Sequence, residues 1–592
     1  MSFYTRHTWR WVILLICLSL AFLGLLFRFV QLTVIDRSFL LKQGDARSQR
    51  MIERPALRGM ITDRDHYPLA ITTRVASIWV DPQAFVANTD NLNTLSSLLG
   101  DSTVVLQKRL KKNNSKEFVY LKRHLSPQLS KKVMALHLPG VHSLNEYRRY
   151  YPEADVTAQL IGFTNIDNQG QEGLELAYNE SLKGIPGKEK VSKDGVGHVI
   201  ALLGIVRAEE PGKDLELSID HRIQYLAYRY LADAVTQVNA AAGSVIVLDV
   251  KTGEVLAMAN VPSYNPNQTV DTRIDSLRNR CVTDTFEPGS TTKAISLANV
   301  LAQGKYTPDS IIDTNPGWMV LNGHVVRDPE GNDGVINMTT VLVKSSNVGT
   351  AKLTLTTPPN SLWELLHKMG YGQLTGSGFP GEVKGSLPLH KWSDFTLATL
   401  SFGYGLSATP LQVANAYATI ARGGIKMPVS LVKLQHPPQG ERVMDAKIAS
   451  QVKMMLEAVV DQAAVKAQVP GYRVFGKTGT VRMLASNGKG YDEKRHIAFF
   501  AGGAPASNPR LIVMVVLQDP KKGYYSAQIL APVFSQIMGG ALRVLDVAPD
   551  KSVSDVAPDK RSPDVVPDKR APDVASDKRV LDITPHKVDN KD

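Results

Sequence analysis

Ser290 and Lys293 are three residues apart, just after a Pro-Gly pair and at the start of a stretch typical of a helix. Residues i and i+3 share one face of a helix, so both side chains are expected to point the same way. A serine hydroxyl needs a nearby base to act as a nucleophile, and a lysine is that base only if burial or another cation lowers its pKa. The pair therefore predicts a serine nucleophile with Lys293 as general base.

The same S-x-x-K spacing also begins at Ser430, Ser450 and Ser486. Ser430 lies in a stretch expected to be a strand, whose period of two puts it on the opposite face from Lys433. Ser450 follows no helix-opening break, and Ser486 lies in a polar loop. Only Ser290 combines the Pro-Gly entry and the helix with suitable downstream partners.

Those partners are S-S-N at residues 345–347 and K-T-G-T at residues 477–480. S-x-x-K, S-D-N and K-T-G occur together in penicillin-binding proteins and β-lactamases. With F-E-P-G-S-T (286–291), K-S-S-N-V-G (344–349) and A-P-A-S-x-P-R (504–510), the chain resembles a class B penicillin-binding protein, closest to the septal, cell-division transpeptidases. The resemblance runs from the membrane segment to about Leu545.

Each motif has an expected role in acyl transfer. Ser290 attacks a carbonyl carbon and Lys293 takes its proton, with Lys477 lowering the pKa of Lys293 through like charge. Ser345 is expected to relay the proton to the leaving amine. Asn347 is expected to hold Lys293 and the substrate amide.

The K-T-G-T stretch is expected to bind substrate. The charge of Lys477 and the hydroxyls of Thr478 and Thr480 suit a substrate carboxylate, and Gly479 leaves room for a close backbone approach. The N–H groups of the nucleophile and of Thr480 are expected to form the oxyanion hole. Val481 follows where the family often has alanine, which changes the edge of the site rather than its chemistry.

The resemblance also implies the substrate, namely the D-alanyl-D-alanine end of a peptidoglycan stem peptide. An acyl-enzyme would form with release of D-alanine, the amine of a neighbouring stem peptide would then complete the cross-link, and β-lactams would acylate the same serine. No metal or organic cofactor is expected. The implied partners are a membrane glycosyltransferase and other division proteins, which we expect to contact the pedestal and the membrane helix.

Three alternatives remain open at this point. An elongation-type class B transpeptidase has the same chemistry in a different complex. A β-lactamase-like hydrolase is disfavoured by the anchor and by the lack of a recognisable deacylating Glu segment. A β-lactam sensor needs a cytoplasmic signalling region, for which ten N-terminal residues are too few.

Other sequence features favour structural roles. Residues 471–478 match the P-loop pattern, but the stretch favours a strand and no helix follows. The K-T-G at 251–253 is expected to form a hairpin turn. The net charge of +12 fits an anionic membrane or wall, and the basic stretch 108–116 lacks the interleaved aromatics typical of nucleic-acid binding.

The elements that position these motifs divide the chain into five parts. Residues 1–10 are expected to be cytoplasmic, because positive charges precede the apolar helix predicted at 11–35. An elongated α+β pedestal follows at 36–215, and the catalytic domain at 216–545. The tail, 546–592, repeats every nine residues and is too rich in Pro, Asp and Lys to form a core, so disorder is expected.

The pedestal carries the family's R-G-M-I-T-D-R (58–64), R-Y-Y-P (149–152) and E-G-L-E (172–175) stretches, which we expect to supply buried salt bridges and turns. Its usual D-R-x-G turn is D-R-D-H here, without the glycine that favours positive φ. In the catalytic domain, strands are expected at 215–219, 243–249, 254–259, 473–480, 496–500 and 511–517, and helices at 221–239 and 527–542. With a helical insertion from about 290 to 420, these elements predict an α/β fold of the penicillin-binding/serine β-lactamase type, an antiparallel sheet with helices on both faces.

Overall fold

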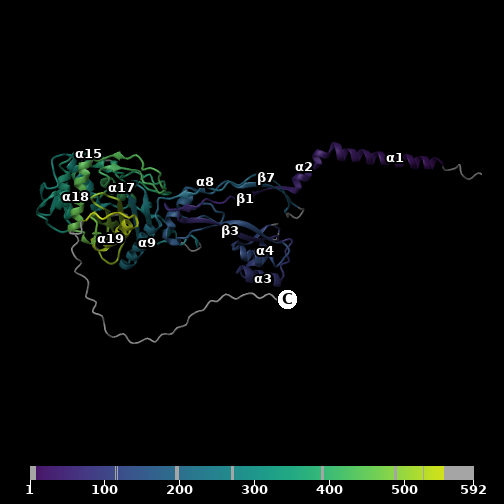
Figure 1. Cartoon of the computed structure of the whole chain (residues 1–592), viewed down its shortest axis with the longest axis horizontal. Helices are drawn as coiled ribbons and strands as arrows, with labels where there is room; N and C mark the ends of the chain where they lie inside the picture. The colour runs from purple at the N-terminus through teal and green to yellow at the C-terminus, as the bar shows by residue number, and fades with distance from the viewer. Residues whose placement is uncertain are drawn as a thin grey trace, which may run out of the picture.

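The computed structural model describes residues 8–551, except for 114, 117, 194–198, 269–272, 389–392, 486–489 and 524–525. Ser486 and most of the predicted disordered tail therefore lie outside the described residues. Figure 1 shows an elongated molecule with α1 at one end, the catalytic domain at the other and the pedestal between them. The two ends of the described chain are thus far apart.

The N-terminal region is helical and exposed. Helix α1 (Thr8–Val30) continues through a π-helical turn, η1 (Gln31–Ile35), into α2 (Arg37–Ser48). Within the described residues, the segment Trp9–Ile35 is the helix that is long and apolar enough to cross a membrane. This result agrees with the predicted membrane segment at 11–35.

The pedestal contains two sheets. The first joins β1 (Gln49–Arg54), β6 (Gly187–Lys193) and β7 (Val199–Arg207) in that order. The second has the order β4-β3-β2-β8, with β5 also paired to β3. Its strands are β2 (Ile61–Thr62), β3 (Pro68–Val80), β4 (Val119–Leu125), β5 (Val141–Tyr150) and β8 (Leu215–Glu216). The helices and helical turns are α3 (Thr89–Leu99), α4 (Thr103–Lys112), α5 (Pro127–Met134), η2 (Ala154–Val156), α6 (Ala158–Ile161), α7 (Gly173–Ala177) and α8 (Asn179–Leu182).

The family stretches of the pedestal meet as expected in a buried ion cluster. Arg58 Nη2 lies 2.5 Å from Glu175 Oε2, and Arg149 Nε lies 2.6 Å from Glu175 Oε1. The D-R-D-H turn also forms without glycine, because His66 takes the left-handed conformation (φ 63°) and Asp63 Oδ1 accepts N–H groups from the turn. Histidine and aspartate tolerate such turns better than most residues.

The catalytic domain is built on a five-stranded antiparallel sheet in the order β10-β9-β19-β18-β17. Its strands are β9 (Ala242–Asp249), β10 (Val255–Val261), β17 (Phe475–Leu484), β18 (Tyr491–Ala504) and β19 (Leu511–Gln518). Helices α9 (His221–Val238) and α19 (Ser526–Val544) pack on one face, and α17 (Pro410–Ala421) packs on the other. Because both faces are covered, β9 and nearly all of β19 are buried, with alternate side chains entering different cores.

The insertion between β10 and β17 supplies most of the remaining helices. They are α10 (Ile274–Leu277), α11 (Arg280–Thr283), η3 (Gly289–Thr291), α12 (Lys293–Ala302), α13 (Met338–Val343), α14 (Asn347–Thr354), α15 (Pro359–Lys368), α16 (Asp394–Ser401), α18 (Ala446–Gln462) and η4 (Val465–Ala467). Three short strand pairs accompany them: β11 (Ile311–Asp313) with β14 (Val335–Asn337), β12 (Trp318–Leu321) with β13 (His324–Arg327), and β15 (Ile425–Lys426) with β16 (Glu441–Arg442).

Two stretches that were predicted to be strands are mostly not strands in the structure. The strand expected at 215–219 is only Leu215–Glu216, because the chain then turns toward the capping residue of α9. The stretch around Ser430 forms isolated bridges, Glu254↔Ser430 and Leu217↔Val432, rather than a strand. Apolar and polar residues alternate in both stretches as they do in strands, but each stretch finds only a short segment to pair with in the fold.

Candidate active site

The nucleophile turn is shaped by a close approach of two loops. Ser290 lies in η3, and Lys293 begins α12 directly afterwards. Gly289 N–H donates to Gly403 O at 3.1 Å, and a Cβ added at Gly403 would lie 2.2 Å from Gly289 O. Glycine is therefore required at 403, so that the loop S-F-G-Y-G (residues 401–405) can support the turn that carries Ser290.

The S-S-N motif joins α13 to α14, and each of its residues does something different. Ser345 takes a left-handed conformation (φ 59°), which is uncommon for a residue with a side chain and directs the turn toward Ser290. Ser346 caps α14 by accepting the N–H of Gly349 at 2.8 Å. Asn347 is the first residue of α14.

The fold brings Lys293 and Ser345 to Ser290 in a continuous chain of contacts. Ser345 Oγ lies 2.9 Å from Ser290 Oγ, and Lys293 Nζ lies 3.2 Å from Ser345 Oγ. Lys293 Nζ also donates to Asn347 Oδ1 at 2.8 Å and to the main-chain oxygen of Ser345. Asn347 in turn donates to Arg327 O at 2.8 Å, so its amide orientation is fixed.

The lysine of this chain is electrostatically unusual. Its side chain is fully buried, and burial, followed by the nearby charge of Lys477, lowers the pKa of Lys293 well below its ordinary value. Asp328 and Asp333 act in the opposite direction but do not outweigh burial. Burial also lowers the pKa of Lys477 to about 8. The lowered pKa of Lys293 favours the neutral amine, which is the form that a general base must have.

The K-T-G-T motif lies on β17, which is one of the two edge strands of the sheet. Thr478 and Thr480 are half-buried on one side of the strand, and Lys477 and Gly479 are buried on the other. A Cβ added at Gly479 would lie 2.0 Å from a ring carbon of Phe499, so only glycine fits there. An edge strand keeps main-chain groups that an extended peptide can pair with.

Sequence reasoning missed two residues that organise the site. Asp328, at the end of the β12–β13 hairpin, accepts from Ser346 Oγ at 2.9 Å and from Val348 N at 2.8 Å. Ser526, at the start of α19, lies 2.6 Å from Thr480 Oγ1 and donates to Gly479 O. No local sequence pattern identifies either residue, because each of these contacts joins segments that are far apart in the sequence.

The competing motifs occupy other places. Lys433 binds Glu216 and the main chain of Arg64, and Ser450 lies inside α18. The K-T-G at 251–253 forms the β9–β10 turn, with Gly253 at φ 77°. The P-loop-like stretch 471–478 leads into β17 rather than into a helix. No cluster of metal-ligating side chains occurs among the described residues.

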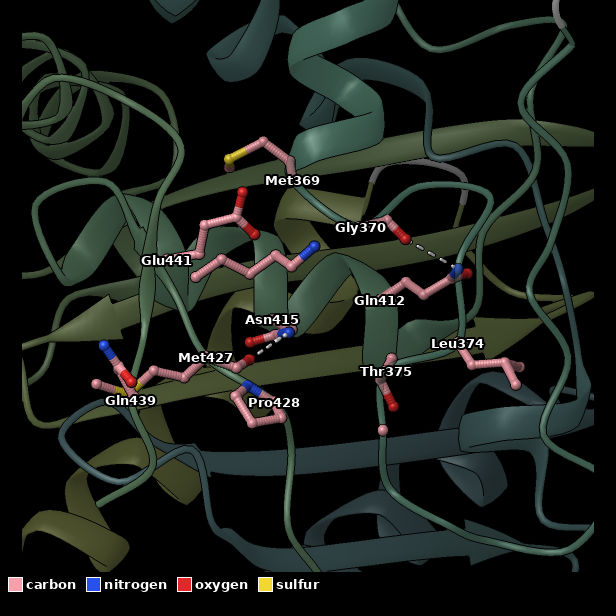
Figure 2. Close-up of a pocket in the computed structure, with 12 residues that line it drawn as sticks. Met369, Gly370, Leu374, Thr375, Gln412, Asn415, Met427, Pro428, Gln439 and Glu441 are labelled. Carbon is pink, nitrogen blue, oxygen red and sulfur yellow. Dashed lines mark hydrogen bonds between the residues drawn. The ribbon is translucent and has the colours of Figure 1, made fainter.

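A cavity of about 320 Å³ also lies beside α17, and it shares no residue with the three motifs. Figure 2 shows that its polar side chains bind main-chain groups: Gln412 donates to Gly370 O and Asn415 donates to Met427 O. Gln412 also completes the capping box of α17 with Thr409. These amides position the helix, so the cavity does not replace the S-x-x-K site as the candidate active site.

Comparison with known proteins shows the family to which the chain belongs. Residues 243–539 match the penicillin-binding protein transpeptidase domain, and residues 53–217 match the penicillin-binding protein dimerisation domain. The chain is 43% identical to peptidoglycan D,D-transpeptidase FtsI of Escherichia coli, over 92% of this chain and 93% of that protein. It is 42% identical to a probable peptidoglycan D,D-transpeptidase, PbpC, of Pseudomonas aeruginosa, over 92% of this chain and 97% of that protein.

Solved structures give the same result. Penicillin-binding protein 3 from Mycobacterium tuberculosis in complex with aztreonam aligns with a TM-score of 0.66 and 28% identity, covering 84% of this chain and 98% of that one. The transpeptidase domain of penicillin-binding protein 3 from Burkholderia pseudomallei is 40% identical with a TM-score of 0.52, covering 57% of this chain and 98% of that one. The chain therefore belongs to the class B penicillin-binding proteins and has an FtsI-like transpeptidase domain.

Proposed function

We propose that the chain is a peptidoglycan D,D-transpeptidase that cross-links stem peptides at the division septum through an acyl intermediate on Ser290. The observation that carries this proposal is the set of contacts of Lys293. A neutral amine has two N–H groups and one lone pair. Two partners of Lys293 Nζ, the main-chain oxygen of Ser345 and Asn347 Oδ1, are acceptors, which leaves the lone pair for the Ser345 hydroxyl.

In the acylation step, Ser290 Oγ attacks the carbonyl carbon of the penultimate D-alanine. The proton of Ser290 passes through Ser345 Oγ to Lys293 Nζ. The N–H groups of Ser290 and Thr480 stabilise the oxyanion, and removing one such donor typically costs about 10²–10³ in rate. When the C–N bond breaks, Ser345 delivers the proton to the leaving D-alanine amine.

In the second step, the amine of a neighbouring stem peptide attacks the acyl carbon. The attacking amine gives a proton to Lys293, and the bond between the acyl carbon and Ser290 Oγ breaks. Lys293 then gives the proton to Ser290 Oγ, which restores the serine. Thr478 binds the carboxylate of the donor peptide, to which the buried Lys477 contributes positive charge. The extended backbone of that peptide lies along β17 at Gly479. The Thr480 hydroxyl is held by Ser526, which keeps the adjacent N–H in place.

Intact mass spectrometry after incubation with a penicillin tests the acyl-serine site. The full-length protein is expected to gain the mass of the penicillin and to lose this adduct only slowly. The Ser290→Ala protein is expected to gain none. A folded wild-type protein without an adduct would contradict the proposed nucleophile. An adduct that clears within seconds would favour the hydrolase alternative.

The proposed location is the cytoplasmic membrane, with the N-terminus in the cytoplasm and the catalytic domain outside it. The apolar helix Trp9–Ile35 and the positive residues before it support this orientation. The similarity to FtsI of Escherichia coli supports division over elongation. In fluorescence microscopy, a fluorescent fusion of this protein is expected to concentrate at the septum. An even distribution along the side wall would favour the elongation type.

Partner contacts are proposed on the pedestal and the membrane helix, with a membrane glycosyltransferase and other division proteins as partners. Strand β7 supports this proposal because Ile200, Leu202 and Ile205 expose more than half of their surface on an edge strand. Exposed apolar edges are typical of interaction sites. Photo-crosslinkers in β7 should capture a membrane protein, whereas crosslinks confined to the catalytic domain would contradict this contact.

A further inference from the structure

A cavity of about 440 Å³ lies where the pedestal meets the catalytic domain. The pedestal lines it with β4, the end of β5 and the loop 164–168, and the catalytic domain contributes Pro266 and Asn267. Asn267 is bonded to the main chain of Tyr151, donating to its oxygen at 2.9 Å and accepting its N–H at 3.0 Å. A ligand in this cavity would therefore touch both domains at their junction.

The lining of this cavity is cationic. Its cations are Lys122, Arg123, Arg148 and Arg149, and no carboxylate residue lines it. Three of these cations already have carboxylate partners: Lys122 pairs with one at 2.7 Å, Arg123 with two at 2.9 Å, and Arg149 with one at 2.6 Å. Arg148 is exposed and has no ion pair within the part of the chain that the structure describes.

The buried ion cluster beside the cavity is unbalanced. Glu175 is the carboxylate for two guanidinium groups, those of Arg58 and Arg149, and all three side chains are almost completely buried. Arg149 Nη2 is buried without a hydrogen-bond partner among the described residues, although the other two nitrogens of this guanidinium are bonded. A buried positive charge without a carboxylate of its own is unfavourable, and an anion in the neighbouring cavity would compensate this charge.

We propose that this cavity is an anion-binding site for a carboxylate or phosphate group, held by Arg148 and by the unbalanced charge of Arg149. Arginine binds both groups well, because its planar fork offers parallel N–H donors. The cavity is larger than a single oxyanion, so the anion belongs to a longer ligand or enters with water. Bound there, it contacts the pedestal and the catalytic domain at once and stabilises their junction.

Calorimetric titration of the full-length protein in detergent micelles tests this site. The titrants are sodium phosphate and sodium glutarate at constant ionic strength, with sodium chloride as the blank. Arg148→Gln is expected to weaken binding about tenfold, the effect of losing one charge-assisted hydrogen bond. Arg74→Gln is the matched control, because Arg74 is an exposed arginine on the neighbouring strand β3 that does not line the cavity.

The two titrants distinguish the sources of the anion. Binding of phosphate alone assigns a phosphate ligand, and binding of glutarate alone assigns an acidic peptide or other carboxylate. No binding of either anion, or equal weakening in both arginine variants, would overturn the proposal. Acylation by penicillin checks that the catalytic domain is folded in both variants, and far-UV circular dichroism checks the pedestal, so a failed titration does not reflect a misfolded protein.

A second variant tests the charge of the cavity without any ligand. Asn165 lines the cavity, and its Oδ1 accepts the N–H groups of Asp167 and Gln169 at 3.0 and 2.9 Å. An aspartate can keep both bonds while it adds a negative charge. Asn165→Asp is expected to raise the midpoint of thermal unfolding at low salt and to weaken anion binding at least tenfold. A lowered midpoint with unchanged binding would contradict a cationic site.

Discussion

Asp328 is the contact through which the β12–β13 hairpin holds the S-S-N motif, and its replacement gives the sharpest test of the site. Its carboxylate accepts from Ser346 Oγ and Val348 N, and its side chain is buried. Ser346 caps α14, and Asn347 at the start of that helix binds Lys293. Loss of this carboxylate should therefore affect both stability and the position of the general base.

The magnitude follows from the two bonds. Asp328→Ala leaves a buried hydroxyl and a buried N–H without an acceptor, at about 1–3 kcal/mol each, so the free energy of unfolding should fall by about 2–6 kcal/mol. Asp328→Asn keeps one acceptor and can donate to the hydroxyl of Ser346, so its loss should be about 1–2 kcal/mol. If about 1.4 kcal/mol of either loss appears in the activation free energy of acylation, because Asn347 is displaced, acylation slows about tenfold.

The assays are urea unfolding and the second-order rate of acylation by a fluorescent penicillin. Glu364→Gln is the control, because Glu364 is an exposed carboxylate in α15, outside the three motifs and the β12–β13 hairpin. We expect the order wild type, Asn, Ala in both assays, with the control close to wild type. An Asp328→Ala protein with wild-type stability and a wild-type acylation rate would refute the reasoning, since it would show that the motif is held in place by other contacts.

Three further predictions concern other parts of the structure. Lys477→Met removes a cation that lowers the pKa of Lys293, so the pKa of Lys293 should rise. In a plot of acylation rate against pH, the ascending limb should therefore move to higher pH. The descending limb near the Lys477 pKa of about 8 should disappear. An ascending limb at lower pH would contradict like-charge coupling. Gly403→Ala places a Cβ 2.2 Å from Gly289 O and should slow acylation at least about tenfold with little change in penicillin affinity, as stopped-flow measurements can resolve. Glu175→Gln leaves two buried guanidinium groups without their carboxylate and should destabilise the pedestal by about 3–5 kcal/mol in urea unfolding, whereas a loss below about 1 kcal/mol would mean that the cluster is already solvated.

The sequence was sufficient to predict those features that a short stretch encodes by itself. The hairpin of β9 and β10, the helix α9 and the apolar helix at the N-terminus all follow from local periodicity and turn residues. The three motifs of the site were also predictable, because each has its own spacing. The fold brings S-x-x-K and S-S-N into direct contact and places K-T-G-T beside them, where Lys477 lowers the pKa of Lys293.

The remaining features depend on contacts between distant segments. Asp328 and Ser526 stand in ordinary loop and helix-start contexts, and only the fold brings them to Ser346 and Thr480. The stretch around Ser430 alternates like a strand but meets only isolated bridging partners, so periodicity overestimated its structure. The charge imbalance around Glu175 was likewise invisible, since the two arginines it pairs with lie 117 and 26 positions away.

The elongated arrangement in Figure 1 has a consequence for where the enzyme can work. The twelve residues of α2 alone span about 18 Å beyond the apolar helix, and the length of the pedestal adds to this distance. A catalytic domain carried on such a spacer moves laterally with its anchor but keeps a nearly constant height above the lipid. With the catalytic domain outside the membrane as proposed, the length of the pedestal, rather than any property of Ser290, would set the depth of the wall at which new cross-links are made. Shortening the pedestal would then lower that layer without changing the chemistry.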